Sequence, residues 1–133
     1  MTDLHPLAGV YAAAVTPLQK NASALDLDSV SAFLHFLNSR GCTGALLFGT
    51  TGEGPSFSSK ERETYLRHVN SIRKELNGFK LLAGTGTPSL SETIELTKLA
   101  FELGIFLLVF QAILKKSRYL SWVGCDNQVN IYF

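Results

Sequence analysis

The chain has 133 residues, of which 46% are hydrophobic and 17% charged, and its formal net charge is +1. This composition is typical of a globular protein and excludes a mainly disordered chain. No basic stripe stands out, and the longest apolar run, residues 105–114, is too short to cross a bilayer. We therefore expect neither a nucleic acid nor a membrane as a partner.

The two cysteines, Cys42 and Cys125, belong to no disulfide or zinc-binding motif. No C-x-x-C pair and no histidine at metal-ligand spacing accompanies them, so we expect no metal ion. Free thiols fit a reducing compartment. Residues 1–6 lack the basic and apolar regions of a secretory signal, and the expected location is therefore the cytoplasm.

The first part of the chain predicts a strand, a helix and a second strand. Residues 10–16, V-Y-A-A-A-V-T, form an apolar run that Pro17 closes, as is typical of a buried strand. After a polar connection, Asp26 precedes apolar residues at three- and four-residue steps, which predict a helix ending at Gly41. Residues 45–48 are bulky and uncharged, which favours a strand buried on both faces.

A second helix follows. Ser58 and Glu61 have the S-x-x-E spacing of a capping box, in which each residue satisfies a backbone N–H of the other. Pro55 keeps the helix from starting earlier, and the apolar positions behind Ser58 continue at helical spacing. The Asn-Gly pair at 77–78 is expected to end this helix.

The same alternation continues once more. Residues 81–84 predict a third short strand, and Ser89 with Glu92 repeats the capping-box spacing at the start of a third helix. Gly104 is expected to end that helix. Residues 105–110 are again apolar and predict a fourth strand.

This order of strands and helices predicts an α/β fold. Strands that alternate with helices at this spacing form βαβ units around a parallel sheet. A doubly wound sheet and a (β/α)8 barrel both begin in this way. A barrel needs about 250 residues, so the chain holds about half of one.

The glycine-rich turn at residues 49–54, G-T-T-G-E-G, is the candidate site. Its glycines let the backbone take positive φ angles or approach a ligand closely. Chemistry in α/β proteins lies at the carboxyl ends of strands, where Thr50, Thr51 and Glu53 stand. The turn lacks the Lys-Ser or Lys-Thr of a P-loop, and its glycine order differs from that of a dinucleotide fingerprint. The remaining functional interpretation is a turn that binds a carboxylate or an oxyanion.

A structural interpretation stays open beside it, in which the glycines make a tight turn and the threonines satisfy local backbone groups. Glu53 fits a turn or cap better than a general acid. A second glycine turn, residues 84–87, ends the third strand on the same side and favours a shared pocket. His5, His35 and His68 have no serine or carboxylate partner that the sequence places beside them, so packing or surface roles are expected.

Three segments together resemble the dihydrodipicolinate synthase / N-acetylneuraminate lyase family of pyruvate-dependent class I aldolases. They are A-A-A-V-T-P at 12–17, G-T-T-G-E-G-P-S-F-S-S-K-E-R at 49–62 and L-L-A-G-T-G-T at 81–87. The middle segment carries the specific signature, G-[ST]-T-G-E followed by a helix that begins S-x-x-E-R. The resemblance implies that residues 7–104 are the N-terminal half of an incomplete (β/α)8 TIM barrel, and that residues 105–133 are a divergent tail holding a fourth strand and then irregular chain.

The resemblance also implies a function. In this family a lysine amine forms a Schiff base with pyruvate, and the resulting enamine attacks an aldehyde, or the reverse reaction cleaves a C–C bond. By resemblance, Thr51 holds the carboxylate of pyruvate or another 2-oxo acid, while Thr50 contacts the substrate and belongs to a catalytic hydroxyl relay with tyrosines. No cofactor is implied, and the family forms homo-oligomers, often tetramers. The reaction resembles that of 4-hydroxy-tetrahydrodipicolinate synthase; the alternative is a 2-keto-3-deoxy sugar-acid aldolase or an N-acetylneuraminate lyase-like enzyme.

The sequence departs from the family pattern after Gly104, because the expected Pro-x-Tyr segment is missing and no tyrosine comes before Tyr119. The family's Schiff-base lysine is on the sixth strand, beyond this chain, while Lys80 precedes its strand and Lys115 belongs to a solvated cluster. We therefore expect the chain alone to be inactive, and a frameshift, alternative splicing or a faulty gene model to explain the tail. A rival interpretation is a non-catalytic truncated isoform or interaction fragment. A small flavodoxin-like nucleotide-binding domain is a weaker one.

Overall fold

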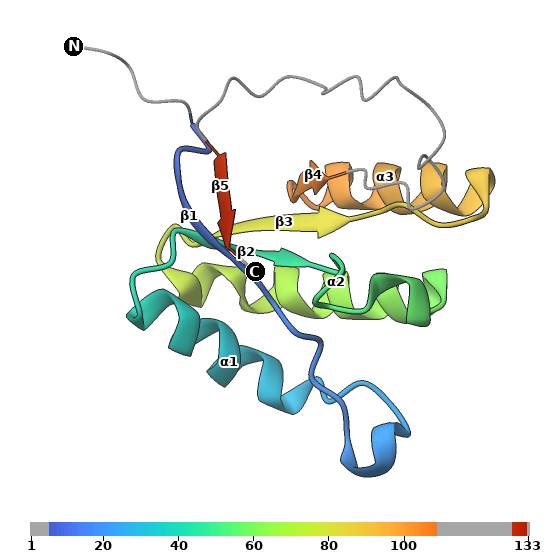
Figure 1. Ribbon diagram of the computed structural model, residues 1–133, viewed down its shortest axis with the longest axis horizontal. Helices are drawn as coiled ribbons and strands as arrows, with labels where there is room; N and C mark the ends of the chain where they lie inside the picture. Colours follow the sequence, from blue (N-terminus) through green and yellow to red (C-terminus); the bar gives the residue numbers. More distant parts are fainter. Residues whose placement is uncertain (1–5, 109–128, 133) are drawn as a thin grey trace.

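The computed structural model describes residues 6–108 and 129–132, which form one parallel sheet with helices packed against it (Figure 1). The sheet has the strand order β4-β3-β2-β1-β5. The strands are β1 (Gly9–Ala13), β2 (Gly44–Leu47), β3 (Lys80–Gly84), β4 (Phe106–Leu108) and β5 (Val129–Tyr132). The helices are α1 (Asp28–Ser39), α2 (Ser59–Ile72) and α3 (Leu90–Glu102), with short 3-10 helices η1 (Lys20–Ala22), η2 (Gly54–Ser56) and η3 (Arg73–Leu76).

The predicted alternation of strands and helices is confirmed. Strands β1, β2, β3 and β4 are neighbours in chain order, and every pairing between them is parallel. The first strand is shorter than the predicted 10–16, because the chain leaves the sheet after Ala13, although the Ala14 N–H still donates to the Leu46 carbonyl at 3.0 Å. The fourth strand lies inside the predicted 105–110, of which residues 109 and 110 are outside the described part of the chain.

The core lies between the sheet and the helices. In Figure 1, α1 and α2 run side by side on one face of β2 and β3. Alternate strand residues, such as Leu47 and Leu81, face the helices and join their apolar stripes in one buried cluster. Leu46 and Leu82 point to the opposite face and are buried with Tyr11. Strand β2 is therefore buried on both faces, as its uniformly apolar sequence predicts.

The start of α2 has the predicted capping box. The Glu61 N–H donates to the Ser58 Oγ at 3.2 Å, and the Ser58 N–H donates to the Glu61 carboxylate at 2.8 Å. The Ser58 hydroxyl also donates to that carboxylate, at 2.7 Å. At the start of α3 the match is weaker, since the Ser89 Oγ accepts from the Glu92 N–H at 3.4 Å and the reciprocal bond is not among the described contacts.

We expect Ser58→Ala to lower the free energy of unfolding by about 1 kcal/mol, because it leaves an N–H of the first helical turn unsatisfied. The Ser58 hydroxyl first, and its backbone N–H second, lower the pKa of Glu61 below its usual value. The ionised Glu61 carboxylate therefore stabilises the folded chain. This stabilisation is complete above the pKa of Glu61 in the unfolded chain and is lost as pH falls through its lower pKa in the folded chain. Urea unfolding at neutral and at acidic pH measures both effects.

A matched control for that substitution is Ser71→Ala on the same helix. The Ser71 hydroxyl is exposed and donates only to the His68 carbonyl, so its loss is expected to change the free energy of unfolding by less than about 0.5 kcal/mol. Equal effects of the two substitutions, or a cost of Ser58→Ala that is the same at both pH values, would contradict the role of the capping box.

The first predicted helix ends as expected, while α2 ends at Ile72 and the 3-10 helix η3 leads from it to the Asn-Gly pair at 77–78. Gly41 follows α1 with φ +88°, the left-handed conformation that ends a helix at low steric cost. At the start of α1, Asp26 accepts a hydrogen bond from the Ser29 N–H at 3.3 Å, although the helix begins two residues after Asp26. The side chain therefore caps from a position just outside the helix.

Strand β5 is not indicated by any pattern in the sequence. It pairs in parallel with β1, from Val129 opposite Gly9 to Tyr132 opposite Ala12. Four residues are too few to give a clear alternation, so the sequence predicts irregular chain where the structure places a strand. The expectations for Lys115, Tyr119 and Cys125 concern residues outside the described part of the chain.

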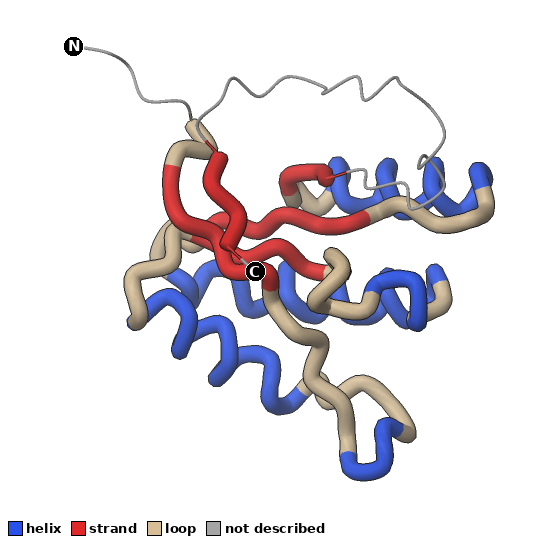
Figure 2. The backbone as a smooth tube through the Cα atoms, viewed as in Figure 1, coloured by secondary structure: helices blue, strands red, loops and turns tan. Residues whose placement is uncertain are grey.

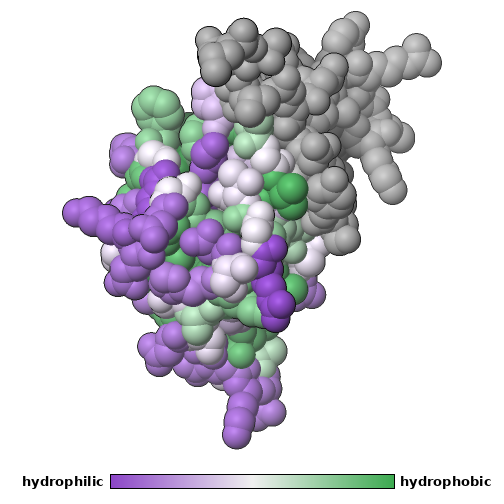
Figure 3. All heavy atoms as spheres, turned by 90° about the vertical axis from the view of Figure 1, so that its left-hand side faces the viewer, coloured by the Kyte–Doolittle hydropathy of each residue, from purple (hydrophilic) through white to green (hydrophobic). Residues whose placement is uncertain are grey.

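The described surface carries a mixture of hydrophilic and apolar side chains. Figure 3 views the left-hand side of Figure 1, and hydrophilic and apolar side chains are interspersed over this face. Within residues 6–108 and 129–132, no helix is long and apolar enough to cross a membrane.

Candidate anion-binding turn

The candidate site lies where β2 and β3 end. Because the two strands are parallel and adjacent, their carboxyl ends meet at the same end of the sheet (Figure 1). In Figure 2 a loop leaves each strand at this end and leads into the next helix. The turn of residues 48–54 follows β2, and the turn of residues 85–87 follows β3. The sequence prediction that the two glycine turns lie on the same side is confirmed.

Phe48, the first residue after β2, has a strained backbone. Its φ is +54°, a left-handed conformation that is rare for a bulky residue and that clusters at functional sites. The side chain is 4% exposed, and its ring packs against Phe57 and, edge to face at 5.0 Å between centroids, against Tyr65. The packing of this ring holds the backbone in a conformation that the sequence alone does not indicate.

The glycines of the two turns are needed because the backbone of Phe48 lies against them. A Cβ atom at Gly54 or at Gly84 would overlap the carbonyl oxygen of Phe48. A Cβ atom at Gly52 would lie 2.8 Å from the Ala14 carbonyl oxygen. Of the two roles expected for these glycines, close approach is therefore the one observed. The approaching group is the protein's own backbone.

The segment that follows β1 also contacts the turn. The Thr16 hydroxyl donates to the Gly52 carbonyl at 2.7 Å. Within the turn, the Glu53 N–H donates to the Thr50 carbonyl at 3.1 Å, and the Glu53 carbonyl accepts from the Ser56 N–H at 2.8 Å. Glu53 has φ +51° and precedes η2, so it has the turn role that the sequence favours over a general acid.

Thr50 and Thr51 are exposed at the surface of this braced turn. Neither hydroxyl makes a hydrogen bond to the described residues, and the backbone N–H groups of both threonines are likewise without a partner there. The turn thus presents two hydroxyl donors and two amide donors on a rigid support. Such a group of donors is chemically suited to a small anion.

Arg62 ends the segment that carries the family signature, but no functional role is expected for it from the sequence. It lies on α2, is 2% exposed, and its Nη1 donates to the Gly86 carbonyl at 3.0 Å. Its Nη2 donates to the Gly54 carbonyl, so one guanidinium contacts both turns. Burial lowers the pKa of Arg62, and the charge of Glu92 partly opposes this shift. The available signal was an arginine on the apolar face of a helix, next to the capping residue Glu61.

The other candidates have ordinary structural roles. His35 lies on α1, exposed, with its Nε2 3.9 Å from the Glu75 carboxylate, and His68 lies within α2. His5 is outside the described residues. No group of three or more histidine, cysteine, aspartate or glutamate side chains that could hold a metal ion occurs within residues 6–108 and 129–132.

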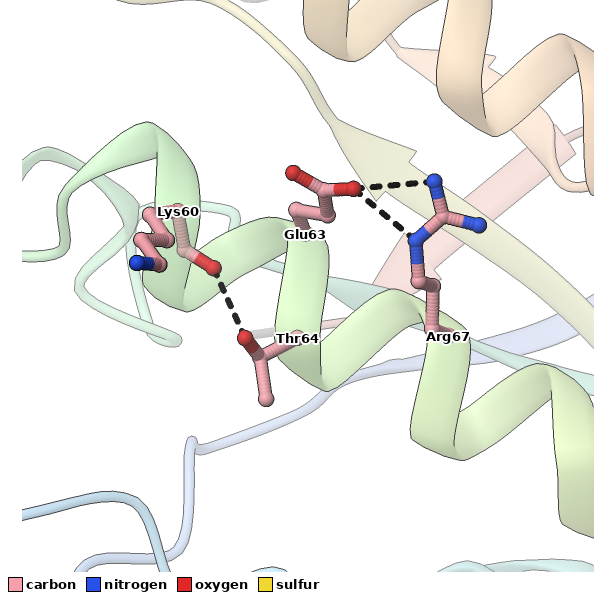
Figure 4. A network of polar contacts seen from close by, with 4 residues as sticks. All are labelled: Lys60, Glu63, Thr64 and Arg67. Atoms are coloured by element: carbon pink, nitrogen blue, oxygen red, sulfur yellow. Dashed lines mark hydrogen bonds and ion pairs between the residues drawn. The ribbon is translucent and has the colours of Figure 1, made fainter.

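A surface cleft between α2 and α3 lies away from this turn. Its α2 side includes Lys60, Glu63 and Arg67, and it lacks both Thr50 and Thr51. Figure 4 shows that the side chains of Glu63 and Arg67 point toward each other, and Arg67 Nη2 lies 2.8 Å from Glu63 Oε1. An exposed ion pair of this kind contributes little to stability.

The sequence of this chain is similar to those of known proteins. The sequence model of the "Dihydrodipicolinate synthetase family" matches residues 6–110. An uncharacterized DapA-like lyase of Chloroflexus aurantiacus is 38% identical over 97 residues, which are 73% of this chain and 31% of that protein. The chain therefore spans about a third of the length of such relatives.

Two solved structures have the same local fold. Dihydrodipicolinate synthase DapA-2 of Bacillus anthracis has a TM-score of 0.65 at 31% identity, over 77% of this chain and 34% of that one. N-acetylneuraminate lyase of Proteus mirabilis has a TM-score of 0.68 at 31% identity, over 76% of this chain and 33% of that one. The predicted α/β fold, a segment of a (β/α)8 barrel, is confirmed by this match.

Proposed function

The chain belongs to the dihydrodipicolinate synthetase family, and we propose that its turn at residues 49–54 binds the carboxylate of pyruvate or of another 2-oxo acid. The observation that carries this proposal is the pair of exposed threonines, whose hydroxyl and amide donors lack partners among the described residues. Thr51 is the carboxylate holder and Thr50 binds beside it. A carboxylate accepts several such hydrogen bonds at once, and these are stronger than bonds between neutral groups.

For the whole protein we propose a lyase of the synthase type, which joins pyruvate to an aldehyde or cleaves the product. Its lysine amine would condense with the keto carbon of pyruvate, and Thr50 would act as a catalytic group that passes protons. The alternative within the family is a 2-keto-3-deoxy sugar-acid aldolase or an enzyme like N-acetylneuraminate lyase. We propose that the reaction takes place in the cytoplasm and that the whole protein is a homo-oligomer. Within this chain, we propose that residues 7–104 are the barrel segment and residues 105–133 the tail.

We propose that this chain by itself binds the 2-oxo acid non-covalently. A Schiff-base lysine needs a desolvated amine at the carboxyl end of a strand. The described lysines are elsewhere: Lys80 begins β3 and its Nζ donates to the Pro6 carbonyl, while the others are on η1, α2, η3 and α3. The amine that reacts with bound pyruvate is therefore assigned to a part of the protein other than residues 6–108.

A pyruvate titration followed by NMR tests this function. We expect the amide signals of Thr50 and Thr51 to shift with pyruvate and to stay in place with acetone, which lacks the carboxylate. Thr51→Val keeps the shape and removes the hydroxyl, and we expect it to weaken binding about 10-fold. Borohydride added to the purified chain with labelled pyruvate is expected to leave no covalent adduct.

The matched control is Thr64→Val, because the Thr64 hydroxyl is on the outer face of α2 and donates only to the Lys60 carbonyl at 2.9 Å (Figure 4). This variant should bind pyruvate like the wild type. Equal binding of acetone and pyruvate, or equal loss in the two variants, overturns the carboxylate-binding role of Thr51. A borohydride-trapped adduct overturns the non-covalent role.

The second candidate function is a non-catalytic fragment or truncated isoform that joins intact subunits. The observation in its favour is the exposed apolar face of α3, which includes Leu90, Ile94 and Phe101. Co-expression with an intact relative, followed by pull-down and a pyruvate titration, separates the two. Capture without pyruvate binding favours the interaction fragment.

A further inference from the structure

We propose that Arg62 is a positioning residue that locks the turn after β2 to the turn after β3 and thereby fixes Thr50 and Thr51 for an incoming acid. This inference rests on the proposed function. The side-chain hydrogen bonds of Arg62 go to backbone carbonyls and not to either threonine. Arg62 acts through the backbone of the two turns.

The first support is the pair of hydrogen bonds from one guanidinium. Its two terminal nitrogens donate to carbonyls that belong to different βα units, Gly54 after β2 and Gly86 after β3. The planar fork of an arginine presents both donors in a fixed geometry, whereas a lysine ammonium is a single point on a flexible stem. Only arginine therefore fixes the two carbonyls relative to each other at this position.

The second support is the strained residue between the turns. The guanidinium carbon of Arg62 lies 5.9 Å from the centroid of the Phe48 ring. The carbonyl oxygen of Phe48 lies against the α-carbons of Gly54 and Gly84, one in each turn. Arg62 and Phe48 thus brace the same pair of turns, one by hydrogen bonds and the other by close backbone contact.

The third support is burial. The Arg62 side chain is 2% exposed, and its Nε atom has no hydrogen-bond partner among the described residues. A buried cation with an unsatisfied donor costs free energy. A residue that served only to fill space would avoid this cost with an apolar side chain of similar volume. The geometry points to a role for which the two carbonyl contacts are required.

Arg73 offers a matched comparison at the other end of the sheet. It begins η3, is partly buried, and its Nη1 donates to the Leu103 carbonyl at 3.1 Å. Leu103 follows α3 and precedes β4, so this bond braces the amino ends of β3 and β4. Arg62 and Arg73 therefore make the same kind of contact, and only Arg62 bonds to the turn that carries the threonines.

The experiment compares Arg62→Lys with Arg73→Lys in the full chain by pyruvate titration and by urea unfolding. We expect Arg62→Lys to weaken pyruvate binding about 10-fold and Arg73→Lys to leave it within about 2-fold, while both lower stability. In Arg62→Ala, millimolar guanidinium ion is expected to restore part of the binding and to leave the wild type unchanged. The carbonyl ¹³C signal of Gly86 should move only in the Arg62 variants.

The outcomes separate the positioning role of Arg62 from the proposed binding of pyruvate. If the wild type binds pyruvate and Arg62→Lys binds it as well as Arg73→Lys does, the positioning role is wrong and the proposed function stands. If the wild type fails to bind pyruvate, the proposed function is wrong and this inference falls with it. If Arg62→Ala does not fold, Arg62→Lys and the Gly86 carbonyl signal still decide, because an unchanged signal overturns the lock between the turns.

Discussion

Gly84→Ala is expected to lower the free energy of unfolding by about 3 kcal/mol, at the upper end of what overpacking costs. The added methyl group would overlap the carbonyl oxygen of Phe48. A side chain can rotate away from such a clash, but this oxygen belongs to a backbone that is buried and already strained at φ +54°. Relief would separate the ends of β2 and β3. Urea unfolding of the variant measures the cost.

Gly78→Ala is the control for this prediction. Gly78 has φ +76°, and a Cβ atom there would have no neighbour within 4 Å, so alanine meets only the cost of the left-handed conformation. That cost is about 1 kcal/mol. A Gly84→Ala variant that is no less stable than Gly78→Ala would show that the turns separate freely. Such a result would also weaken the case that the two turns are held together as one support.

The chain is expected to self-associate through one face of α3. Leu90, Ile94 and Phe101 lie on one side of this helix at helical spacing and are 70%, 45% and 78% exposed. In a closed (β/α)8 barrel every outer helix has a helix on each side, whereas among the described α-helices α3 packs extensively against α2 only. An apolar stripe left open in this way favours association. Size-exclusion chromatography over a range of concentrations measures it.

The double variant Ile94→Gln with Phe101→Gln is expected to move the elution toward the monomer. Phe36→Gln is the control, because Phe36 is also exposed, at 52%, but is on α1 with the Arg40 guanidinium over its ring at 5.1 Å. We expect this control to associate like the wild type. Elution of the wild type as a monomer at all concentrations would refute the prediction.

The sequence predicts the elements well because their signals are local. Ser58 and Glu61 fix the start of α2 within a single turn of chain, and the apolar run of β2 reports directly that both faces are buried. These patterns depend on residues within a few positions of each other. The signature around Thr50 and Thr51 indicates the family, and the match of the family model to residues 6–110 confirms it.

What the sequence does not predict depends on contacts between distant segments. The conformation of Phe48 results from rings and glycines that come from other parts of the chain, including Tyr65 and Gly84. The contacts of Arg62 join residues 24 positions apart, and nothing in the local pattern gives that partner. The glycines were correctly identified as sites of close approach or unusual backbone, but the approaching group was visible only in three dimensions.

The pairing of β5 with β1 has a consequence for how large an assembly of this chain can become. The outer N–H and C=O groups of β1 already bond to the chain's own residues Val129–Tyr132. Among the described strands, β4 and β5 each have a neighbour on one side only, so the sheet has two open edges. A sheet with two open edges can add copies without limit, as in a fibril. Pairing of the β4 edge of one chain with the β5 edge of the next would again leave one edge open at each end, so growth through the sheet has no built-in end point.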